Sequence, residues 1–250
     1  MGTIDIGEMR RNTGGSSING GQITETAATI RGNALFAGLR ESECTEIGKR
    51  ARGRSLADNE VIFMEGDPAR SVVLIQTGTV KLTRLSAGGS EVILWMAGRG
   101  ESIGMLSDTL THCYACTART VEPTRALIWD STVMQGFLEE HPRIRENIGH
   151  ILSSRMNELA ERFHEVATEK VSKRVALLLL RLVKQIGKPA FGGVEVSLSR
   201  EELAQMTGTT LFTVSRLLSR WGELGYVLPR RAAVVVLDAQ RLGMVSGGGD

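Results

Sequence analysis

Residues 200–221 combine small and turn-forming residues with apolar residues at helical spacing, and together these suit contact with the bases of a nucleic acid. Ala204 is small where two crossing helices would touch, and Gly208 tolerates the positive φ that a tight turn between them needs. Apolar residues then recur at helical spacing, which places Val214, Leu217, Leu218 and Trp221 toward a domain interior. The pattern predicts a helix-turn-helix whose second helix keeps a polar face for the major groove of DNA.

That outward face carries the side chains that we expect to touch DNA. Arg216 offers paired donors that match O6 and N7 of guanine, and Ser215 adds a shorter hydrogen bond. Phe212 can offer only apolar surface, which suits a thymine methyl group. Thr209 or Thr210 suits the N-cap of this helix. The predicted contact set from this helix is Thr210, Leu211, Phe212, Ser215, Arg216 and Ser219.

The flanking residues extend the motif in both directions. Ser199 stands three residues before Glu202, the spacing of a capping box at a helix N-terminus. After the second helix, residues 225–228 and 234–237 read as two short strands around a basic turn. Arg230 and Arg231 in that turn would approach phosphate oxygens, a contact that positions a protein without reading sequence. A plain amphipathic helix pair is the competing interpretation, but the wing favours a winged helix-turn-helix.

The middle of the chain has the regular spacing of turn residues that is typical of short strands joined by turns. Turn glycines occur at positions 66, 78, 88–89 and 98–100, and the intervening segments are β-branched and aromatic. The expected strands cover residues 61–64, 72–75, 80–83, 92–96, 114–121 and 125–129. They predict a small antiparallel β-roll or barrel over residues 55–130, preceded by a short helical segment at 33–52.

A long amphipathic helix is expected from Pro142 to Ala167. Its apolar residues are separated by steps of four and three, as in a coiled-coil seam, so we expect self-association. Packing of the same stripe on the β-roll of its own chain is the alternative. A dimer would present two recognition helices to a palindromic DNA site. The predicted dimer contacts are Ile148, Leu152, Met156, Leu159 and Phe163.

Composition is that of an ordinary globular chain of 250 residues, with 42% hydrophobic and 23% charged residues. The net charge of +2 conceals an asymmetry, because residues 169–250 hold 12 Lys and Arg against 7 Asp and Glu. There is no secretory signal pattern, no apolar run long enough to span a membrane, and three cysteines, which together predict a cytoplasmic protein.

These features predict an α+β chain of four parts. Residues 1–32 would be a flexible N-terminal arm, because glycine, serine and threonine are scattered there without period. Residues 33–140 would form the β-roll, 141–168 the dimerisation helix, and 169–250 the winged helix-turn-helix domain.

The ordered combination of these parts resembles the CRP/FNR superfamily of bacterial transcription regulators. The segments that carry the resemblance are VIFMEGD at 61–67, GTVKL at 78–82, GESIG at 100–104, VSKRVA at 171–176 and TVSRLL at 213–218. The resemblance implies a cyclic-nucleotide-binding-like sensor domain, a homodimer, an inverted-repeat DNA site, a small-molecule effector and contact with RNA polymerase. It also places the effector pocket at Gly104, Met105, Leu106, Tyr114 and Cys116.

The pocket positions depart from the cyclic-nucleotide members of the superfamily. Those members carry Gly-Glu-Leu followed by an Arg for the phosphate, whereas this chain has Gly104-Met105-Leu106 and Tyr114. A thioether and a phenol do not replace a carboxylate and a guanidinium, so these residues disfavour cyclic AMP as the effector. Arg119 could serve from a neighbouring strand, but its spacing does not match.

The cysteines and histidines are the residues that other sensing chemistries would use. The iron–sulfur members cluster cysteines near the N-terminus, and none precedes Cys44 here. No metal site is predicted. Haem or a reactive thiol stays an alternative, around Met105, His112, Cys113 and Cys116 in the pocket region and His150 and His164 on the long helix. An enzyme using His112 and Cys113 is disfavoured, since adjacent strand residues point apart. A nonspecific architectural DNA-binding protein is the remaining competitor.

Overall fold

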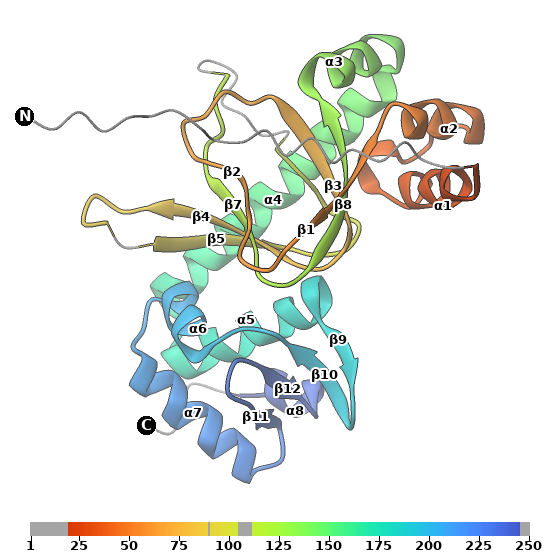
Figure 1. Cartoon of the computed structure of the whole chain (residues 1–250). Coiled ribbons are helices and arrows are strands. Elements are labelled where there is room, and N and C mark those ends of the chain that lie inside the picture. Colours follow the sequence, from red (N-terminus) through yellow and green to blue (C-terminus); the bar gives the residue numbers. More distant parts are fainter. Residues whose placement is uncertain (1–19, 90, 105–111, 246–250) are drawn as a thin grey trace, which may run out of the picture.

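The computed structural model describes residues 20–89, 91–104 and 112–245, and confirms the α+β class with its β-roll, long helix and winged helix-turn-helix (Figure 1). Two antiparallel four-stranded sheets form the β-roll. The first sheet has the order β1-β8-β3-β6, with β1 Arg52–Leu56, β8 Thr124–Asp130, β3 Ser71–Thr77 and β6 Ser102–Ile103. The second has the order β2-β7-β4-β5, with β2 Val61–Phe63, β7 Thr117–Thr120, β4 Val80–Leu85 and β5 Glu91–Ala97.

The interior of the roll follows from the alternation of its strands. Val80 and Leu82 on β4 and Ala118 on β7 are buried, because successive strand residues point to opposite faces. They pack against Val73 and Ile75 of β3 in one apolar cluster. The two sheets therefore enclose an apolar core. The strand β1 was not predicted, since its RGRSL sequence is largely polar and exposed.

Helices cover the other face of the first sheet. They are α1 Gly20–Arg31, the 3₁₀ turn η1 Ala34–Phe36, α2 Glu41–Lys49 and α3 Ser131–Glu140. The indole of Trp129 anchors this layer, because its Nε1–H donates to the carbonyl oxygen of Ile47 at 2.8 Å and its ring lies 5.6 Å from Phe36. Burial of Trp129 and Phe36 fixes the helices on the sheet.

The prediction of a flexible arm reaching residue 32 is wrong where α1 lies. Ile30 and Thr26 are buried in this helix, and Ile30 belongs to the same apolar cluster as Trp129. Burial against a distant part of the chain stabilises a helix that has little periodic pattern of its own. The rest of the predicted arm, residues 1–19, lies outside the described residues.

The long helix is α4, Pro142–Thr168. Near its N-terminal end the helix is attached to the η1 segment by Asn147, whose Nδ2 donates to the carbonyl oxygens of Leu35 and Ala37, both at 2.9 Å. Further along, Arg162 Nη1 donates to the carbonyl oxygen of Leu94 at 2.8 Å. Because β5 is an edge strand, this bond covers a carbonyl that no neighbouring strand reaches. Helix α4 is thus tied to the η1 segment near its start and to β5 further along.

The C-terminal domain follows directly (Figure 1). Its elements are α5 Val171–Ile186, β9 Lys188–Ala190, β10 Gly193–Val196, α6 Arg200–Thr207, α7 Leu211–Glu223, β11 Val227–Pro229, β12 Val234–Val236 and α8 Ala239–Gly243. The predicted two-stranded wing is β11 and β12, and it belongs to a four-stranded sheet of order β11-β12-β10-β9. The β9–β10 hairpin was not predicted.

The two domains share part of one core. Ile93 and Met96 of β5 are buried in the apolar cluster that also contains Leu179 and Trp221 of the C-terminal domain. The backbones of the two domains approach closely at Gly98, where a Cβ atom would lie 2.3 Å from the carbonyl oxygen of Gln185 in α5. A strand of the β-roll domain therefore completes the interior of the C-terminal domain.

Candidate DNA interface and sensor site

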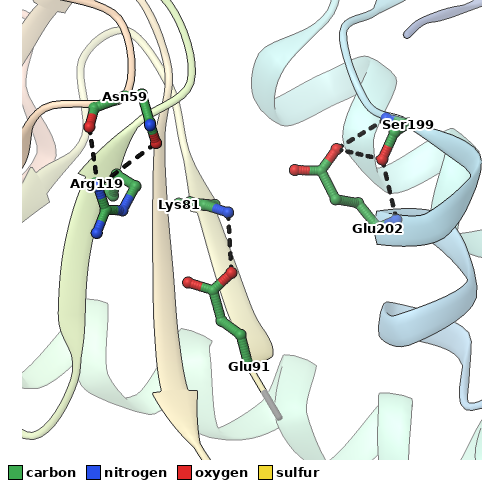
Figure 2. Close-up of polar contacts among 6 residues, drawn as sticks. All are labelled: Asn59, Lys81, Glu91, Arg119, Ser199 and Glu202. Atoms are coloured by element: carbon green, nitrogen blue, oxygen red, sulfur yellow. Dashed lines mark hydrogen bonds and ion pairs between the residues drawn. The ribbon is translucent and has the colours of Figure 1, made fainter. Parts of the chain in front are cut away.

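The first helix of the helix-turn-helix, α6, begins at the predicted capping box. Figure 2 shows that the backbone N–H and hydroxyl of Ser199 both donate to Glu202 Oε2 at 2.8 Å, while the Glu202 N–H donates back to Ser199 Oγ at 3.2 Å. At the end of α6, Gly208 has φ +61°, the left-handed conformation for which glycine was expected. Ala204 is buried where α6 meets α7. The turn geometry inferred from residue types is therefore confirmed.

The second helix, α7, separates its apolar and polar faces as expected. Val214, Leu217, Leu218 and Trp221 are buried, and Thr210 is the N-cap, accepting a hydrogen bond from the Thr213 N–H at 3.2 Å. Ser215 is half-buried on the flank of the helix. The exposed residues on the outer surface are Leu211, Phe212, Arg216 and Ser219, with Phe212 77% exposed. The outer surface of the helix thus presents Arg216 together with two apolar side chains, Leu211 and Phe212.

The wing turn lies between β11 and β12, where the Arg230 N–H donates to the carbonyl oxygen of Ala233 at 2.9 Å. Arg231 is exposed. The guanidinium of Arg230 forms an ion pair with Glu195 of β10, a contact that the sequence did not reveal because β10 was not predicted beside the wing. Arg231 is therefore better placed than Arg230 for a phosphate, since Arg230 would first have to leave Glu195.

The outer face of α4 carries an exposed apolar stripe, which we call the seam. Ile148 is half-buried and packs against the core of its own chain, so it contributes least to the seam. The alternative that the whole stripe packs on the β-roll fails for the rest of the seam. Those side chains are Leu152, 42% exposed, Met156, 66%, Leu159, 59%, and Phe163, 76%.

The predicted effector pocket is tightly filled where the structure describes it. The ring of Tyr114 stacks on Phe63 at 3.9 Å, and the Tyr114 hydroxyl accepts a hydrogen bond from the Ser71 N–H at 3.0 Å. Gly104 lies against both rings, because a Cβ there would be 3.5 Å from each of them and 2.6 Å from the Ser71 carbonyl oxygen. Met105 and Leu106 lie outside the described residues. Tyr114 thus occupies the interior of the roll instead of lining an open space beside Gly104.

Arg119 points away from the roll interior (Figure 2). Its neighbours Ala118 and Thr120 are buried, and its Nη1 donates to the carbonyl oxygen of Asn59 at 2.9 Å. Lys81, its partner in register on β4, forms an ion pair with Glu91 at 3.0 Å. Arg119 therefore does not face the place where a ligand inside the roll would lie.

The cysteines do not assemble a metal site within residues 20–89, 91–104 and 112–245, where no group of three or more His, Cys, Asp or Glu side chains could hold an ion. Cys113 forms an isolated β-bridge with Pro68. Cys116 is half-buried just before β7, and desolvation by burial raises the pKa of its thiol. His112 has φ +52°.

We expect the Cys116 thiol to react slowly with iodoacetamide at pH 7, because a raised pKa leaves less thiolate than an ordinary thiol of pKa about 8.5 has. The rate should rise steeply only at more alkaline pH. The measurement is a pH series on a Cys44→Ser/Cys113→Ser variant, with a small free thiol as reference. Fast alkylation at neutral pH would contradict this expectation and would favour thiol-based sensing.

An open cavity of about 450 Å³ lies elsewhere, between α4 and the β-roll. Its lining comes from three distant segments: residues 33–37 around η1, residues 95–102 of β5 and the following loop, and residues 147–158 of α4. Trp95, Glu101 and Arg155 are its chemically distinctive members, and none was predicted as a site residue. The only sequence signal was a charged residue, Arg155, beside the seam position Met156.

Comparison with known proteins agrees with this architecture. Residues 53–141 match the sequence model of the cyclic nucleotide-binding domain, and residues 173–244 match that of the Crp-like helix-turn-helix domain. The global nitrogen regulator of Synechocystis sp. is 30% identical over 169 residues, which cover 64% of this chain and 73% of the relative. The chain belongs to the CRP/FNR family of transcription regulators.

Two further CRP/FNR matches span more of the chain. The CRP-like cAMP-activated global transcriptional regulator of Mycobacterium tuberculosis is 26% identical over 210 residues, covering 83% of this chain and 94% of that protein. The structure of FixK2 from Bradyrhizobium japonicum superposes with a TM-score of 0.69 at 21% identity, covering 80% of this chain and 99% of FixK2. The whole CRP/FNR architecture is therefore present. No helix of the described residues is long and apolar enough to cross a membrane.

Proposed function

We propose that this CRP/FNR protein is a homodimeric, sequence-specific DNA-binding regulator, controlled by an effector or redox signal sensed in its N-terminal domain. The observation that carries the proposal is the pairing of two exposed surfaces on one chain. The recognition face of α7 offers Arg216 to a major groove, while the seam of α4 offers apolar side chains to a second copy.

Base recognition is assigned to the outer face of α7. Arg216 would pair with guanine, and Phe212 would contact a thymine methyl group at a neighbouring position. The N-terminus of α7 and Arg231 of the wing would hold backbone phosphates. Their contribution is sequence-independent and salt-dependent, in keeping with the basic excess of residues 169–250.

The seam supports the dimer. Its exposed apolar residues would interdigitate with the same residues of a second α4, as in a left-handed coiled coil. Two-fold symmetry would then relate the two α7 helices. An inverted-repeat site with half-sites about one helical turn apart is the DNA that such a dimer fits.

The effector is proposed to be a molecule other than cyclic AMP. Support comes from Tyr114, which fills the roll and bonds to Ser71, and from Arg119, which is engaged by Asn59 on the outside. A buried phosphate needs a charge partner, and neither residue offers one there. Haem is the alternative cofactor, for which an absorbance spectrum with a Soret band would be the positive sign.

Selection of bound duplexes from a random pool tests the proposal. A dyad-symmetric motif containing a guanine in each half-site is the expected outcome. Recovery of sequences without a common motif would instead identify a nonspecific architectural DNA-binding protein. A motif without two-fold symmetry would contradict the proposed dimer.

RNA polymerase is the proposed protein partner, and Phe191 is its candidate contact. This residue lies between β9 and β10 and is 96% exposed, so its ring is accessible to serve as an apolar anchor in a protein contact. The β9–β10 hairpin belongs to the same sheet as the wing. A polymerase bound beside the DNA site could therefore reach it.

Replacing Phe191 with Ser is expected to leave the affinity for DNA alone unchanged and to reduce cooperative binding with bacterial RNA polymerase on a shared promoter. The cause would be the loss of an apolar anchor at the protein contact. The measurement is joint binding in footprinting titrations. Leu224→Ser, at another exposed apolar position of the same domain, is the matched control. Unchanged cooperativity for the Phe191 variant would remove the residue from the interface.

A further inference from the structure

The cavity between α4 and the β-roll has the form of a ligand pocket separate from the interior of the roll. Its volume of about 450 Å³ lies in the range of small-molecule sites. Ala34, Ala37 and Ile151 supply apolar walls, and the Trp95 ring adds an aromatic surface. Hydrogen bonds hold the walls of the cavity in place. The side-chain amide of Asn33 donates to the carbonyl oxygen of Gly100, and that of Asn147 donates to the carbonyl oxygens of Leu35 and Ala37.

Arg155 is a half-buried cation of this cavity, and the nearby carboxyl groups of Glu101 and Glu158 only partly offset its loss of hydration. Its guanidinium lies 5.4 Å from the centroid of the Trp95 ring, and Nη2 donates to the Ser102 carbonyl oxygen at 3.1 Å. A guanidinium has five N–H groups, so this single bond leaves most of its donors for another partner. Among the described residues no carboxylate lies within 4.0 Å of it. Desolvation by burial lowers the pKa of Arg155, as expected for a cation withdrawn from water.

Two carboxyl groups also line the cavity, and both are engaged. Glu101 accepts hydrogen bonds from Trp95 Nε1 at 3.1 Å and from the Gly98 N–H at 2.7 Å. Burial raises the pKa of the Glu101 carboxyl group. Glu158 accepts a hydrogen bond from Gln185 Nε2 at 3.2 Å. Arg155 is thus the charged group of the cavity whose N–H donors could bind a ligand.

We propose that this cavity binds a small organic carboxylate, whose carboxylate group pairs with the guanidinium of Arg155 while its apolar body lies against Trp95, Ala34 and Ile151. An arginine fork matches a carboxylate through two parallel hydrogen bonds. His150 and Ser154, one helical turn apart on α4, line the same cavity and add polar contacts for a second oxygen-bearing group. The proposal rests on the proposed function, for which this carboxylate would be the effector.

The position of the cavity connects it to the DNA-binding domain. Glu158 lines the cavity and bonds to Gln185 of α5, and Glu165, two turns further along α4, holds Arg181 of α5 through two bonds at 2.6 and 2.9 Å. A ligand that moves Glu158 would therefore act on the junction between α4 and α5.

Benzoate is the probe for this site, and benzamide is its neutral counterpart of nearly the same shape. Ligand-observed NMR titrations of the full chain should give benzoate at least about tenfold tighter binding than benzamide, because only benzoate is charged. Arg155→Gln should weaken benzoate binding by about the same factor. Arg145→Gln removes the same charge from an exposed position of α4 and should leave binding unchanged.

A second pair of variants tests the cavity without altering its charge. Ser154→Leu should block benzoate, whereas Ser153→Leu, on an exposed neighbouring position outside the lining, should not. Equal affinity for benzamide, no saturable benzoate binding at millimolar concentration, or full binding by Arg155→Gln and Ser154→Leu would each overturn the proposal. Binding of the same variants to the selected DNA, measured without benzoate, tests the proposed function separately.

Discussion

A Leu159→Glu/Phe163→Glu variant is expected to be monomeric and to bind its palindromic DNA at least about a hundredfold more weakly than the parent protein. Both residues are exposed in the seam, so glutamates there would oppose glutamates of the second copy. Loss of the dimer removes the gain from binding two half-sites at once, which is worth roughly 10²–10⁴ in affinity. Sedimentation measures the mass, and fluorescence anisotropy on a labelled duplex measures the affinity.

Asn157→Glu is the matched control for this variant, because it adds the same charge to an exposed position of α4 outside the seam. It should remain dimeric. The proposed dimer would be wrong if the double variant kept the parent mass. A monomer that retained full affinity for the palindrome would show instead that dimerisation does not contribute to DNA binding.

Arg216→Ala is expected to lower affinity for the preferred sequence by about tenfold to a hundredfold and to relax selectivity at one guanine of each half-site. A bidentate arginine–guanine pair contributes about 1–3 kcal/mol of discrimination against the wrong base. The measurement is a set of duplexes in which each position of the half-site is varied in turn. The affinity of the variant should become independent of the base at the guanine position, while its preference at the other positions should persist.

Arg231→Ala provides the contrast, because a wing contact to phosphate carries no sequence information. It should weaken all duplexes by a similar factor and reduce the dependence of binding on salt. If Arg216→Ala also weakened every duplex equally, Arg216 would touch only the backbone, and the assignment of base reading to this side chain would be wrong.

The helix-turn-helix and the seam could be predicted because both depend on local periodicity. The position of Val214 and Trp221 on the inner side of α7 and of Phe163 in the stripe along α4 follow from helical spacing alone. The turn at Gly208 follows from the conformational demand of one residue type. Such features need no knowledge of what lies elsewhere in the chain.

The features that escaped prediction depend on contacts between distant segments. Helix α1 was taken for part of an arm because its burial of Ile30 depends on α2 and on Trp129. The cavity at Arg155 was missed because its walls are separated by more than fifty residues of sequence. The pairing of Arg230 with Glu195 depends on an unpredicted strand. In each case a side chain's surroundings, and not its own spacing, decide its role.

The insertion of Ile93 and Met96 into the core of the C-terminal domain affects how readily that domain can move relative to the β-roll. Any swing of α7 that separates the two domains must hydrate these side chains. Hydration of apolar surface depends strongly on temperature and on excluded solutes such as sulfate or sucrose. The balance between a docked and a released DNA-binding domain should therefore respond to cooling and to osmolytes even when no effector is present, which makes the domain junction sensitive to the physical state of the solvent.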